Sequence, residues 1–204
     1  MKSMSGNHVV HRCLELFPDE HTKHILDVIA DNCMDIATDR SGCCVLQNCL
    51  DLAQGEPKER LVADITANAL VLSEDPFGNY VVQYLLGRED PLVKGEVLAQ
   101  LQGNFATLSM NKFSSNVVEK CLRETGEENA VRIINEIIES KQFLSVLQDP
   151  YGNYVAQCAL EISKGPLRHR MVSEIQSQYS QLHSHPHGKR VLAKLKGNRH
   201  RLSM

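Results

Sequence analysis

The chain has 204 residues, of which 42% are hydrophobic and 23% are charged, and its net charge at pH 7 is −3. This apolar content excludes a disordered tail, and no apolar run approaches the ~20 residues that a bilayer span needs. Residues 1–8 lack the apolar core of a secretory signal, so we expect a protein that is neither secreted nor inserted in a membrane. The negative charge argues mildly against nucleic-acid binding, for which a basic surface is the usual sign.

Six short segments along the chain resemble one another, and each has a small residue in its second place. The intervals between these small residues are 36 residues, except for one interval of 38. A period of this length lies within the range of roughly 20 to 50 residues that is typical of solenoid proteins. The small residues are Gly6, Gly42, Gly78, Ser114, Gly152 and Gly188.

The period divides the chain into five repeats and a C-terminal cap. One repeat cannot bury its apolar stripes alone, so we expect neighbouring repeats to stack into a continuous all-α core. In chain order the repeats cover approximately residues 1–30, 31–67, 68–103, 104–140 and 141–176, and the cap covers 177–204.

The repeat at 68–103 illustrates the helices that we expect in each repeat. A short apolar segment at 69–72 is followed by Asp75-Pro76, and proline is tolerated in the first turn of a helix. Apolar residues at 81, 82, 85 and 86 then form the stripe of a second helix. A third, amphipathic helix follows, with apolar residues at 93, 97, 98 and 101. No repeat shows the period-two alternation that is typical of a strand.

The seven cysteines are an odd number, and no two of them are spaced as Cys-x-x-Cys. Five of them lie among aliphatic residues, as buried thiols do. This favours reduced core cysteines in a cytoplasmic or nuclear protein over disulfides or a zinc site. The five are Cys13, Cys33, Cys49, Cys121 and Cys158.

Charge is distributed unevenly along the chain. Residues 181–204 contain six basic residues and no acidic one, whereas acidic residues gather in segments such as 51–59 and 124–128. We expect these acidic segments on loops and outer helices, away from a ligand-binding face. That placement would reconcile the net charge with binding of an anionic partner.

Three positions in each repeated segment are not explained by core packing. The first and fifth lie one helical turn apart on one face, and the second flanks them. A solvated helix face is the plain alternative, but it gives no reason to repeat a tyrosine or to prefer amides over Lys and Glu. The first, second and fifth residues are Asn7, His8 and His11; Cys43, Cys44 and Gln47; Asn79, Tyr80 and Gln83; Ser115, Asn116 and Glu119; and Asn153, Tyr154 and Gln157.

The chemistry of these triplets fits unpaired nucleobases. Asn and Gln each carry a hydrogen-bond donor and an acceptor, so a pair one turn apart can meet the Watson–Crick edge of a base. A flat side chain at the second position offers a stacking platform, worth ~1–3 kcal/mol per base. Glu119 differs, because a carboxylate only accepts hydrogen bonds and guanine alone offers two adjacent donors on that edge. The variation between repeats therefore indicates base readout.

The repeated segments resemble those of the Pumilio (PUF) family of RNA-binding repeat proteins, over essentially the whole chain. The resemblance rests on residues 77–83, 112–121 and 151–157, and residues 187–195 resemble the family's degenerate C-terminal cap, which reads no base. It implies a right-handed, armadillo-like α-solenoid superhelix of three-helix repeats that binds single-stranded RNA in mRNA 3′ untranslated regions, one base per repeat. It also implies a monomeric cytoplasmic protein that represses translation or promotes mRNA decay, with protein co-regulators as further partners.

The resemblance implies a base for four of the triplets. The two Asn/Gln pairs imply uracil, the Ser115/Glu119 pair implies guanine, and the Cys43/Gln47 pair resembles the adenine-reading pair. The second residue of each triplet, such as Asn116 or a tyrosine, would lie against the base faces. Because family proteins bind RNA antiparallel to the protein chain, the implied element is 5′-UGUA-3′.

Three features depart from the family pattern. Cys44 stands where an arginine or aromatic residue usually stacks, so we expect a weaker adenine contact. His11 replaces the usual glutamine beside Asn7 and His8, so we expect little discrimination at the base after UGUA. The chain is also expected to begin inside a repeat and to lack the helix before Ser5 and the further N-terminal repeats of a full domain.

Other functions are less well supported by the sequence. An α-solenoid scaffold that binds peptides would not need the repeated triplets, whereas a PUF remnant without RNA binding is kept open by the net acidity. No Gly-rich phosphate loop, nucleophile elbow or HExxH motif appears, so we expect no enzyme, no catalytic residue and no cofactor. His183, His185 and His187 could suggest a metal site, but Pro186 interrupts them at the expected start of the cap helix, so we expect no metal.

Overall fold

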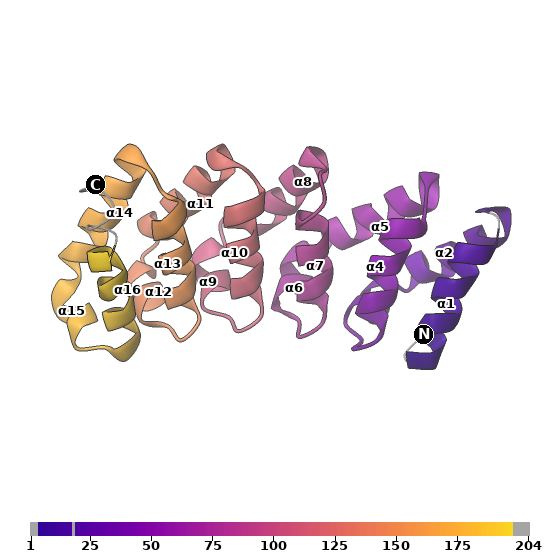
Figure 1. Cartoon of the computed structure of the whole chain (residues 1–204), viewed down its shortest axis with the longest axis horizontal. Coiled ribbons are helices and arrows are strands. Elements are labelled where there is room, and N and C mark those ends of the chain that lie inside the picture. The colour runs from indigo at the N-terminus through magenta and orange to yellow at the C-terminus, as the bar shows by residue number, and fades with distance from the viewer. Residues whose placement is uncertain (1–3, 18, 198–204) are drawn as a thin grey trace. The chain divides into compact units, whose positions relative to one another are not determined.

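The computed structural model describes residues 4–17 and 19–197 of the chain, and its regular secondary structure is helical throughout these ranges (Figure 1). Residues 198–204 of the predicted cap lie outside the described residues. The chain divides into two compact units, Met1–Leu101 and Gln102–Met204. None of the helices in the described part is long and apolar enough to cross a membrane.

Within its described residues, the first unit consists of α1 (Met4–Leu16), α2 (Asp19–Asp31), α3 (Cys33–Ala37), α4 (Gly42–Leu52), α5 (Gly55–Ala67), α6 (Ala69–Glu74), α7 (Gly78–Leu86) and α8 (Pro91–Leu101). Helix α4 packs against both α1 and α7, so these three form a row. Helix α5 packs against both α2 and α8, which gives a second layer in the same order. The short helices α3 and α6 pack against α4 and α7, respectively.

The second unit repeats this plan, with α9 (Phe105–Ser109), α10 (Ser114–Glu124), α11 (Glu127–Glu139), α12 (Phe143–Gln148), α13 (Gly152–Ile162), α14 (Gly165–Ser177), α15 (Tyr179–His183) and α16 (Pro186–Gly197). Helix α13 packs against both α10 and α16, and α11 packs against α14 behind them. The short helices α9, α12 and α15 each pack against the row helix that follows them. We call α1, α4, α7, α10, α13 and α16 the row helices. A short helix, a row helix and a second-layer helix therefore recur in chain order, as predicted.

The apolar stripe of each row helix lies in the core. In α7, residues Val81, Val82, Leu85 and Leu86 are each at most 1% exposed, which confirms the predicted stripe. Full burial of such a side chain contributes roughly 1.5–3 kcal/mol to stability. Val81 and Val82, the apolar pair between the second and fifth positions of the triplet, thus anchor the helix in the core.

The cysteines largely follow the prediction. Cys33, Cys49, Cys121 and Cys158 are buried, whereas Cys13 is only half-buried, in the first row helix. Burial raises the pKa of Cys33, Cys49 and Cys121 to about 12, which keeps these thiols protonated and unreactive near neutral pH.

The prediction for the acidic segments was wrong in part, because Asp51 and Glu124 lie on row helices rather than on loops or second-layer helices. Asp51 lies in the last turn of α4 and accepts hydrogen bonds from Tyr84 and Arg88 of α7. Glu124 ends α10 and pairs with Lys120 one turn earlier. Local cationic and hydroxyl partners therefore offset these charges on the row helices.

A hydrogen-bonded turn precedes four of the row helices. In each turn the Oδ1 atom of an Asp or Asn accepts from two successive backbone N–H groups at 2.7–3.2 Å. These bonds satisfy donors that a helix start would otherwise leave without partners. The residues recur with the repeat period and are Asp39, Asp75, Asn111 and Asp149.

The small residue that follows each turn lies against the preceding short helix. A Cβ atom on Gly42 would lie 2.2 Å from the carbonyl oxygen of Ile36, and one on Gly152 would lie 2.5 Å from that of Val146. In the second unit this position is glycine at 152 and 188 but serine at 114. The Oγ of Ser114 donates a hydrogen bond to the Leu108 carbonyl at 2.7 Å. The repeated glycine is therefore required by close approach of two backbones, and serine is accepted where its hydroxyl bonds the opposing carbonyl.

Replacing Gly42 with alanine should lower the free energy of unfolding by about 1–3 kcal/mol, because the new methyl group must displace the Ile36 carbonyl. Gly95 in α8 is the matched control, since its Cβ would meet nothing within 4 Å. Gly95→Ala should raise stability by up to about 1 kcal/mol, because alanine is favoured over glycine inside a helix. Urea denaturation followed by circular dichroism measures both changes, and equal stability of the two variants would contradict the steric explanation.

Candidate nucleic-acid interface

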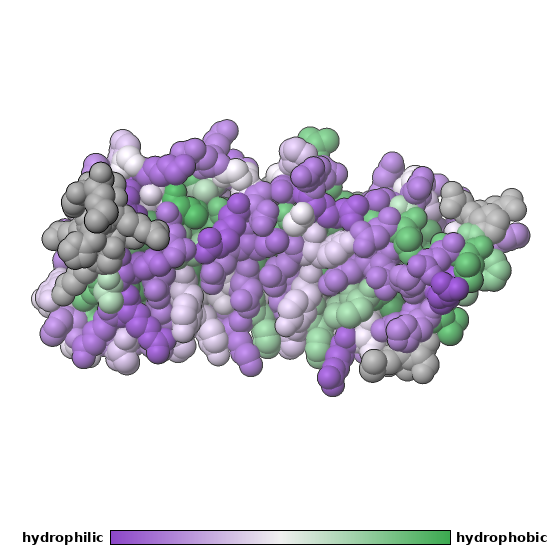
Figure 2. Space-filling model, in the orientation of Figure 1, coloured by the Kyte–Doolittle hydropathy of each residue, from purple (hydrophilic) through white to green (hydrophobic). Residues whose placement is uncertain are grey.

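The predicted triplets lie near the starts of the row helices, at the same register in each. In the first unit they lie on α1, α4 and α7, and in the second unit on α10 and α13. Because neighbouring row helices pack against each other within a unit, the triplets of that unit lie side by side. The surface seen in the orientation of Figure 1 is predominantly hydrophilic, which suits a polar ligand rather than an apolar one (Figure 2).

The asparagines at the first position of two triplets are buried. Asn79 and Asn153 are 2% and 0% exposed. The Nδ2 group of Asn153 donates to the carbonyl oxygens of Asp149 and Pro150, both at 2.9 Å. Asn79 makes the corresponding bonds to Asp75 and Pro76, at 2.8 and 3.1 Å. Both amide hydrogens of each asparagine are therefore used to tie the helix to the turn before it.

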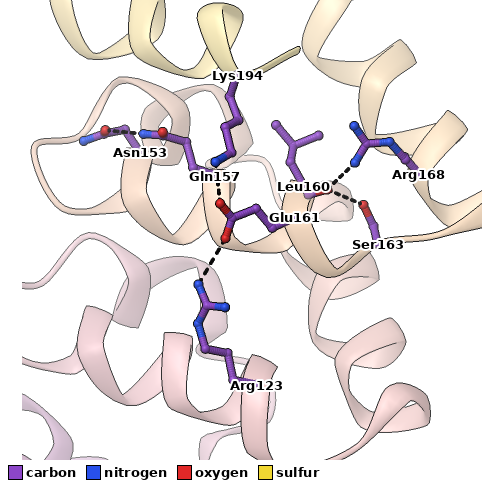
Figure 3. Close-up of polar contacts among 8 residues, drawn as sticks. All are labelled: Arg123, Asn153, Gln157, Leu160, Glu161, Ser163, Arg168 and Lys194. Atoms are coloured by element: carbon purple, nitrogen blue, oxygen red, sulfur yellow. Dashed lines mark hydrogen bonds and ion pairs between the residues drawn. The ribbon is translucent and has the colours of Figure 1, made fainter. Parts of the chain in front are cut away.

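The glutamine at the fifth position is held by the same asparagine. Gln157 Nε2 donates to Asn153 Oδ1 at 3.1 Å (Figure 3), and Gln83 Nε2 donates to Asn79 Oδ1 at 2.9 Å. One N–H and the Oε1 atom of each half-buried glutamine remain to meet a ligand. The asparagine thus orients the glutamine amide, and the glutamine presents an acceptor and a donor to the surface.

The triplet of α10 has a different chemistry. Ser115 is 5% exposed, and Glu119 is half-buried. Burial raises the pKa of the Glu119 carboxyl, which Arg123 lowers and Glu161 raises further. A carboxylate that has already lost part of its water binds an adjacent pair of N–H donors more strongly than a fully hydrated one does.

The second positions are exposed in every triplet. Tyr80 and Tyr154 are 55% and 50% exposed, so their rings are open to a flat ligand. The amide of Asn116 is held against its own helix start by bonds from Nδ2 to the carbonyls of Lys112 and Phe113, at 3.3 and 3.2 Å. Tyr80, Asn116 and Tyr154 therefore each place a flat group on the surface, beside the first and fifth residues of their triplets. His8 and Cys44 are exposed at the same position in the first unit.

The triplet of α4 lacks the amide pair. Cys43 is 4% exposed, and its Sγ lies 3.5 Å from the Arg40 carbonyl. One turn before Gln47 stands Cys43 instead of an asparagine, and the Nε2 of Gln47 reaches the backbone carbonyl of Tyr80 at a long 3.5 Å. This glutamine is consequently held less firmly than Gln83 or Gln157.

The triplet of α1 departs further from the others. Asn7 Nδ2 donates to the carbonyl of Ser41 at 2.7 Å, in the turn before α4. Its Oδ1 is buried and has no hydrogen-bond partner among the described residues. His11 lies 3.5 Å from Glu15, one turn further along the helix. Asn7 and His11 are therefore not coupled as the Asn/Gln pairs are.

A set of ion pairs between row helices was not predicted from the sequence. In the second unit, Glu161 of α13 accepts from Arg123 of α10 at 3.2 Å and from Lys194 of α16 (Figure 3). These hydrogen bonds from Lys194 and Arg123 lower the pKa of the Glu161 carboxyl. The signal was present, because Arg123 and Glu161 each stand eight residues after the first position of their triplet.

The first unit has a corresponding bridge at the same position relative to its triplet. Asp51 of α4, which also stands eight residues after its first triplet position, accepts from Tyr84 and Arg88 of α7, with 2.7 Å to Arg88. These partners lower the pKa of the Asp51 carboxyl, mainly through the Tyr84 hydroxyl. Bridges of this kind join neighbouring row helices beyond their triplets. Each exposed pair by itself contributes little to stability, ~0–1 kcal/mol.

Comparison with known proteins identifies the repeats. The family described as "Pumilio-family RNA binding repeat" matches residues 1–30, 32–66, 68–99, 104–138 and 142–176. Among curated proteins, Pumilio homolog 12 of Arabidopsis thaliana is 46% identical over 195 residues, which cover 96% of this chain and 33% of that protein. Pumilio homolog 9 of the same plant is 44% identical over 194 residues, covering 95% and 34%. The chain thus spans about a third of the length of these relatives.

Solved structures agree with this comparison. The Puf4 RNA-binding domain bound to the HO endonuclease RNA 3′ UTR recognition sequence matches with a TM-score of 0.85 and 37% identity, covering 95% of this chain and 62% of that one. PUF-8 in complex with PBE-RNA matches with a TM-score of 0.85 and 25% identity, covering 97% and 59%. These likenesses confirm the predicted α-solenoid of three-helix repeats.

The buried amide of Asn153 gives a stability test. Asn153→Asp should lower the free energy of unfolding by about 2–4 kcal/mol at neutral pH, because a buried carboxylate would replace two donors and face two carbonyl oxygens. The loss should shrink in acid, where protonation restores one donor. Asn116→Asp is the matched control, since Asn116 makes the same two kinds of bond while exposed. Denaturant unfolding at two pH values measures both, and an equal loss in the two variants would refute the role of burial.

Proposed function

Because the chain belongs to the Pumilio family of RNA-binding repeat proteins, we propose that it binds single-stranded RNA containing the element 5′-UGUA-3′, with one base per repeat. The observation that carries the proposal is the pair of Asn-held glutamines in α7 and α13, with a carboxylate at the same register of α10. The exposed flat group beside each pair supports it further.

Uracil suits the two Asn/Gln repeats. Its edge presents the N3 hydrogen between two carbonyl oxygens, so it needs one acceptor and one donor from the protein. Gln83 and Gln157 supply both, and the bond from Nε2 to the asparagine sets the order in which acceptor and donor face the base. The neighbouring tyrosine would stack on the base, which typically contributes ~1–3 kcal/mol.

Guanine suits the α10 repeat, because its N1 and N2 hydrogens form the adjacent donor pair that the Glu119 carboxylate can accept. Asn116 would lie against the base face. Adenine at the fourth place would use Gln47, whose amide has no asparagine to hold it and can present donor and acceptor in the opposite order. Cys44 is a small platform, so this contact is the weakest of the four, and Asn7 and His11 would discriminate little at the base after it.

The biological setting also belongs to the proposal. The structural relatives were solved with RNA recognition sequences from 3′ untranslated regions, so we place the target in such regions of cytoplasmic mRNA. Bound protein would repress translation or promote mRNA decay by recruiting or blocking protein co-regulators. With a net charge of −3, stacking and edge contacts should contribute more to affinity than salt-sensitive attraction.

Base readout by Ser115 and Glu119 is tested by exchanging them. Wild-type protein should bind UGUA RNA about tenfold or more tighter than UCUA RNA, since a lost base contact costs ~1–3 kcal/mol by analogy with other direct readout. The double variant Ser115→Asn with Glu119→Gln recreates the uracil pair, so its preference at the second base should move from guanine to uracil. Gel-shift titrations of both proteins against UGUA, UUUA and UCUA measure the change. Equal affinity of wild type for UGUA and UCUA would remove the assignment.

Binding of guanine should depend on pH through Glu119. The raised pKa means that this carboxyl protonates at a higher pH than an ordinary glutamate, and the neutral acid cannot accept from both guanine donors. Affinity for UGUA should therefore fall as pH is lowered from neutral, whereas the contribution of Glu119 to folding stability changes in the opposite direction and is lost as pH rises. Fluorescence anisotropy across this pH range measures the affinity, with the Ser115→Asn, Glu119→Gln variant on UUUA as the control that should stay flat. A wild-type profile as flat as that of the variant would contradict the role of the carboxylate.

A further inference from the structure

The Glu119 carboxylate, which reads guanine in the proposed function, has a cation one turn after it on the same helix. Arg123 follows Glu119 by four residues in α10, so the two positions lie on one face. A glutamate four residues before a basic residue is in the favoured order for an ion pair along a helix. In the described part of the chain, however, Arg123 pairs with a different carboxylate and the oxygens of Glu119 accept no hydrogen bond. The acceptors that guanine needs are therefore open.

Arg123 is held by a carboxylate on the neighbouring row helix. Its Nη2 donates to Oε2 of Glu161 in α13 at 3.2 Å, and Lys194 of α16 donates to Oε1 of the same carboxylate (Figure 3). Both oxygens of Glu161 are thus occupied by cations from the two adjacent row helices. Because Glu161 is exposed, these ion pairs contribute little to stability, and the chain should stay folded without them.

The electrostatics around Glu119 fit a cation that is near but not bound to it. Burial raises the pKa of the Glu119 carboxyl, Arg123 lowers it and Glu161 raises it further. The Cys158 thiol of α13 belongs to the same cluster, but burial raises its pKa to about 11, so it is uncharged near neutral pH. Helix α9, which also packs against α10, contains no ionisable residue, and α11 lies behind α10 in the second layer. Arg123 and Glu161 are therefore the charged side chains that act on Glu119.

The geometry points to Glu161 as a positioning residue for guanine recognition: it holds Arg123 across the row helices and so keeps the oxygens of Glu119 free for the base. This inference rests on the proposed function, since it concerns the reader of the second base. Without Glu161, Arg123 would pair with Glu119 one turn earlier and compete with the N1 and N2 hydrogens of guanine for the same two oxygens. Glu161 thus contributes to base identity without contacting the RNA.

Two other consequences of losing Glu161 must be separated from this competition. The released arginine would be able to bind an RNA phosphate, and the loss of a negative charge would favour binding of any RNA. Both effects change the affinities for UGUA and UCUA RNA by the same factor, because the two RNAs carry the same phosphates. The ratio of the two dissociation constants therefore isolates the competition at guanine.

The experiment is an anisotropy titration of folded full-length variants, checked by circular dichroism, against UGUA and UCUA RNA near neutral pH. Glu161→Ala should lower the preference for UGUA by about threefold, more than an exposed ion pair at this spacing would, because Glu119 is half-buried. Adding Arg123→Ala to Glu161→Ala should restore the wild-type preference, since the competitor is then gone. Lys194→Ala is the matched control, because it removes the other ion pair of Glu161 while Arg123 stays held, and it should keep the wild-type preference.

A pH profile of the same ratio gives a readout that a merely structural role of Glu161 would not move. An arginine paired with Glu119 stabilises the charged form, so Glu161→Ala should lower the pKa of the Glu119 carboxyl. The preference for guanine is lost as pH falls through that pKa, so the loss should occur at lower pH in Glu161→Ala than in wild type. Adding Arg123→Ala should cancel this shift.

The preference of wild type for UGUA over UCUA is measured first, because its absence would overturn the proposed function itself. Where wild type has that preference, three results would overturn the inference alone. They are an unchanged preference in Glu161→Ala, a loss that adding Arg123→Ala does not restore, and an equal loss in Lys194→Ala. The first would mean that Arg123 does not compete at Glu119, and the other two that Glu161 acts through the packing of the row helices.

Discussion

The close contact between the first residue of a row helix and a carbonyl oxygen of the short helix before it determines how that row helix is rotated. At Gly152 the space beside the Val146 carbonyl is too small for any side chain, and the Asp149 turn holds the helix start at that point. Once Gly152 faces the short helix, the next residue is buried and the one after it is exposed. Asn153 and Tyr154, at 0% and 50% exposed, follow this order.

The same contact also positions a residue of the proposed RNA-binding site. Asn153 is part of the packing, since its amide satisfies two carbonyl oxygens of the turn, and it is also the group that orients Gln157. The glutamine amide is therefore held in one orientation before any ligand arrives, so less conformational entropy is lost when a base binds. Gln47, which lacks such an asparagine, would lose more. The repeats thus differ in how firmly the fifth residue of the triplet is held.

Side chains beyond the triplets also join neighbouring row helices. Glu161 joins α10, α13 and α16 through Arg123 and Lys194, and Asp51 joins α4 to α7. Stacked bases have a nearly constant spacing, so a reading surface needs neighbouring helices at matched spacing. The prediction that the acidic segments 51–59 and 124–128 lie on loops and outer helices was wrong for Asp51 and Glu124. Asp51 bonds Tyr84 and Arg88 of the adjacent row helix, and Glu124 pairs with Lys120 of its own helix.

The sequence by itself determined the repeat period, the three helices of a repeat and the residues of each triplet, because these depend on local patterns that recur every 36 to 38 residues. Only the tertiary structure decided that Asn79 and Asn153 are buried, that Asn7 bonds the turn before α4, and that Arg190 meets Tyr154. These outcomes depend on the distance and rotation between stacked helices, and residues about one repeat apart in the chain meet only after that stacking is set.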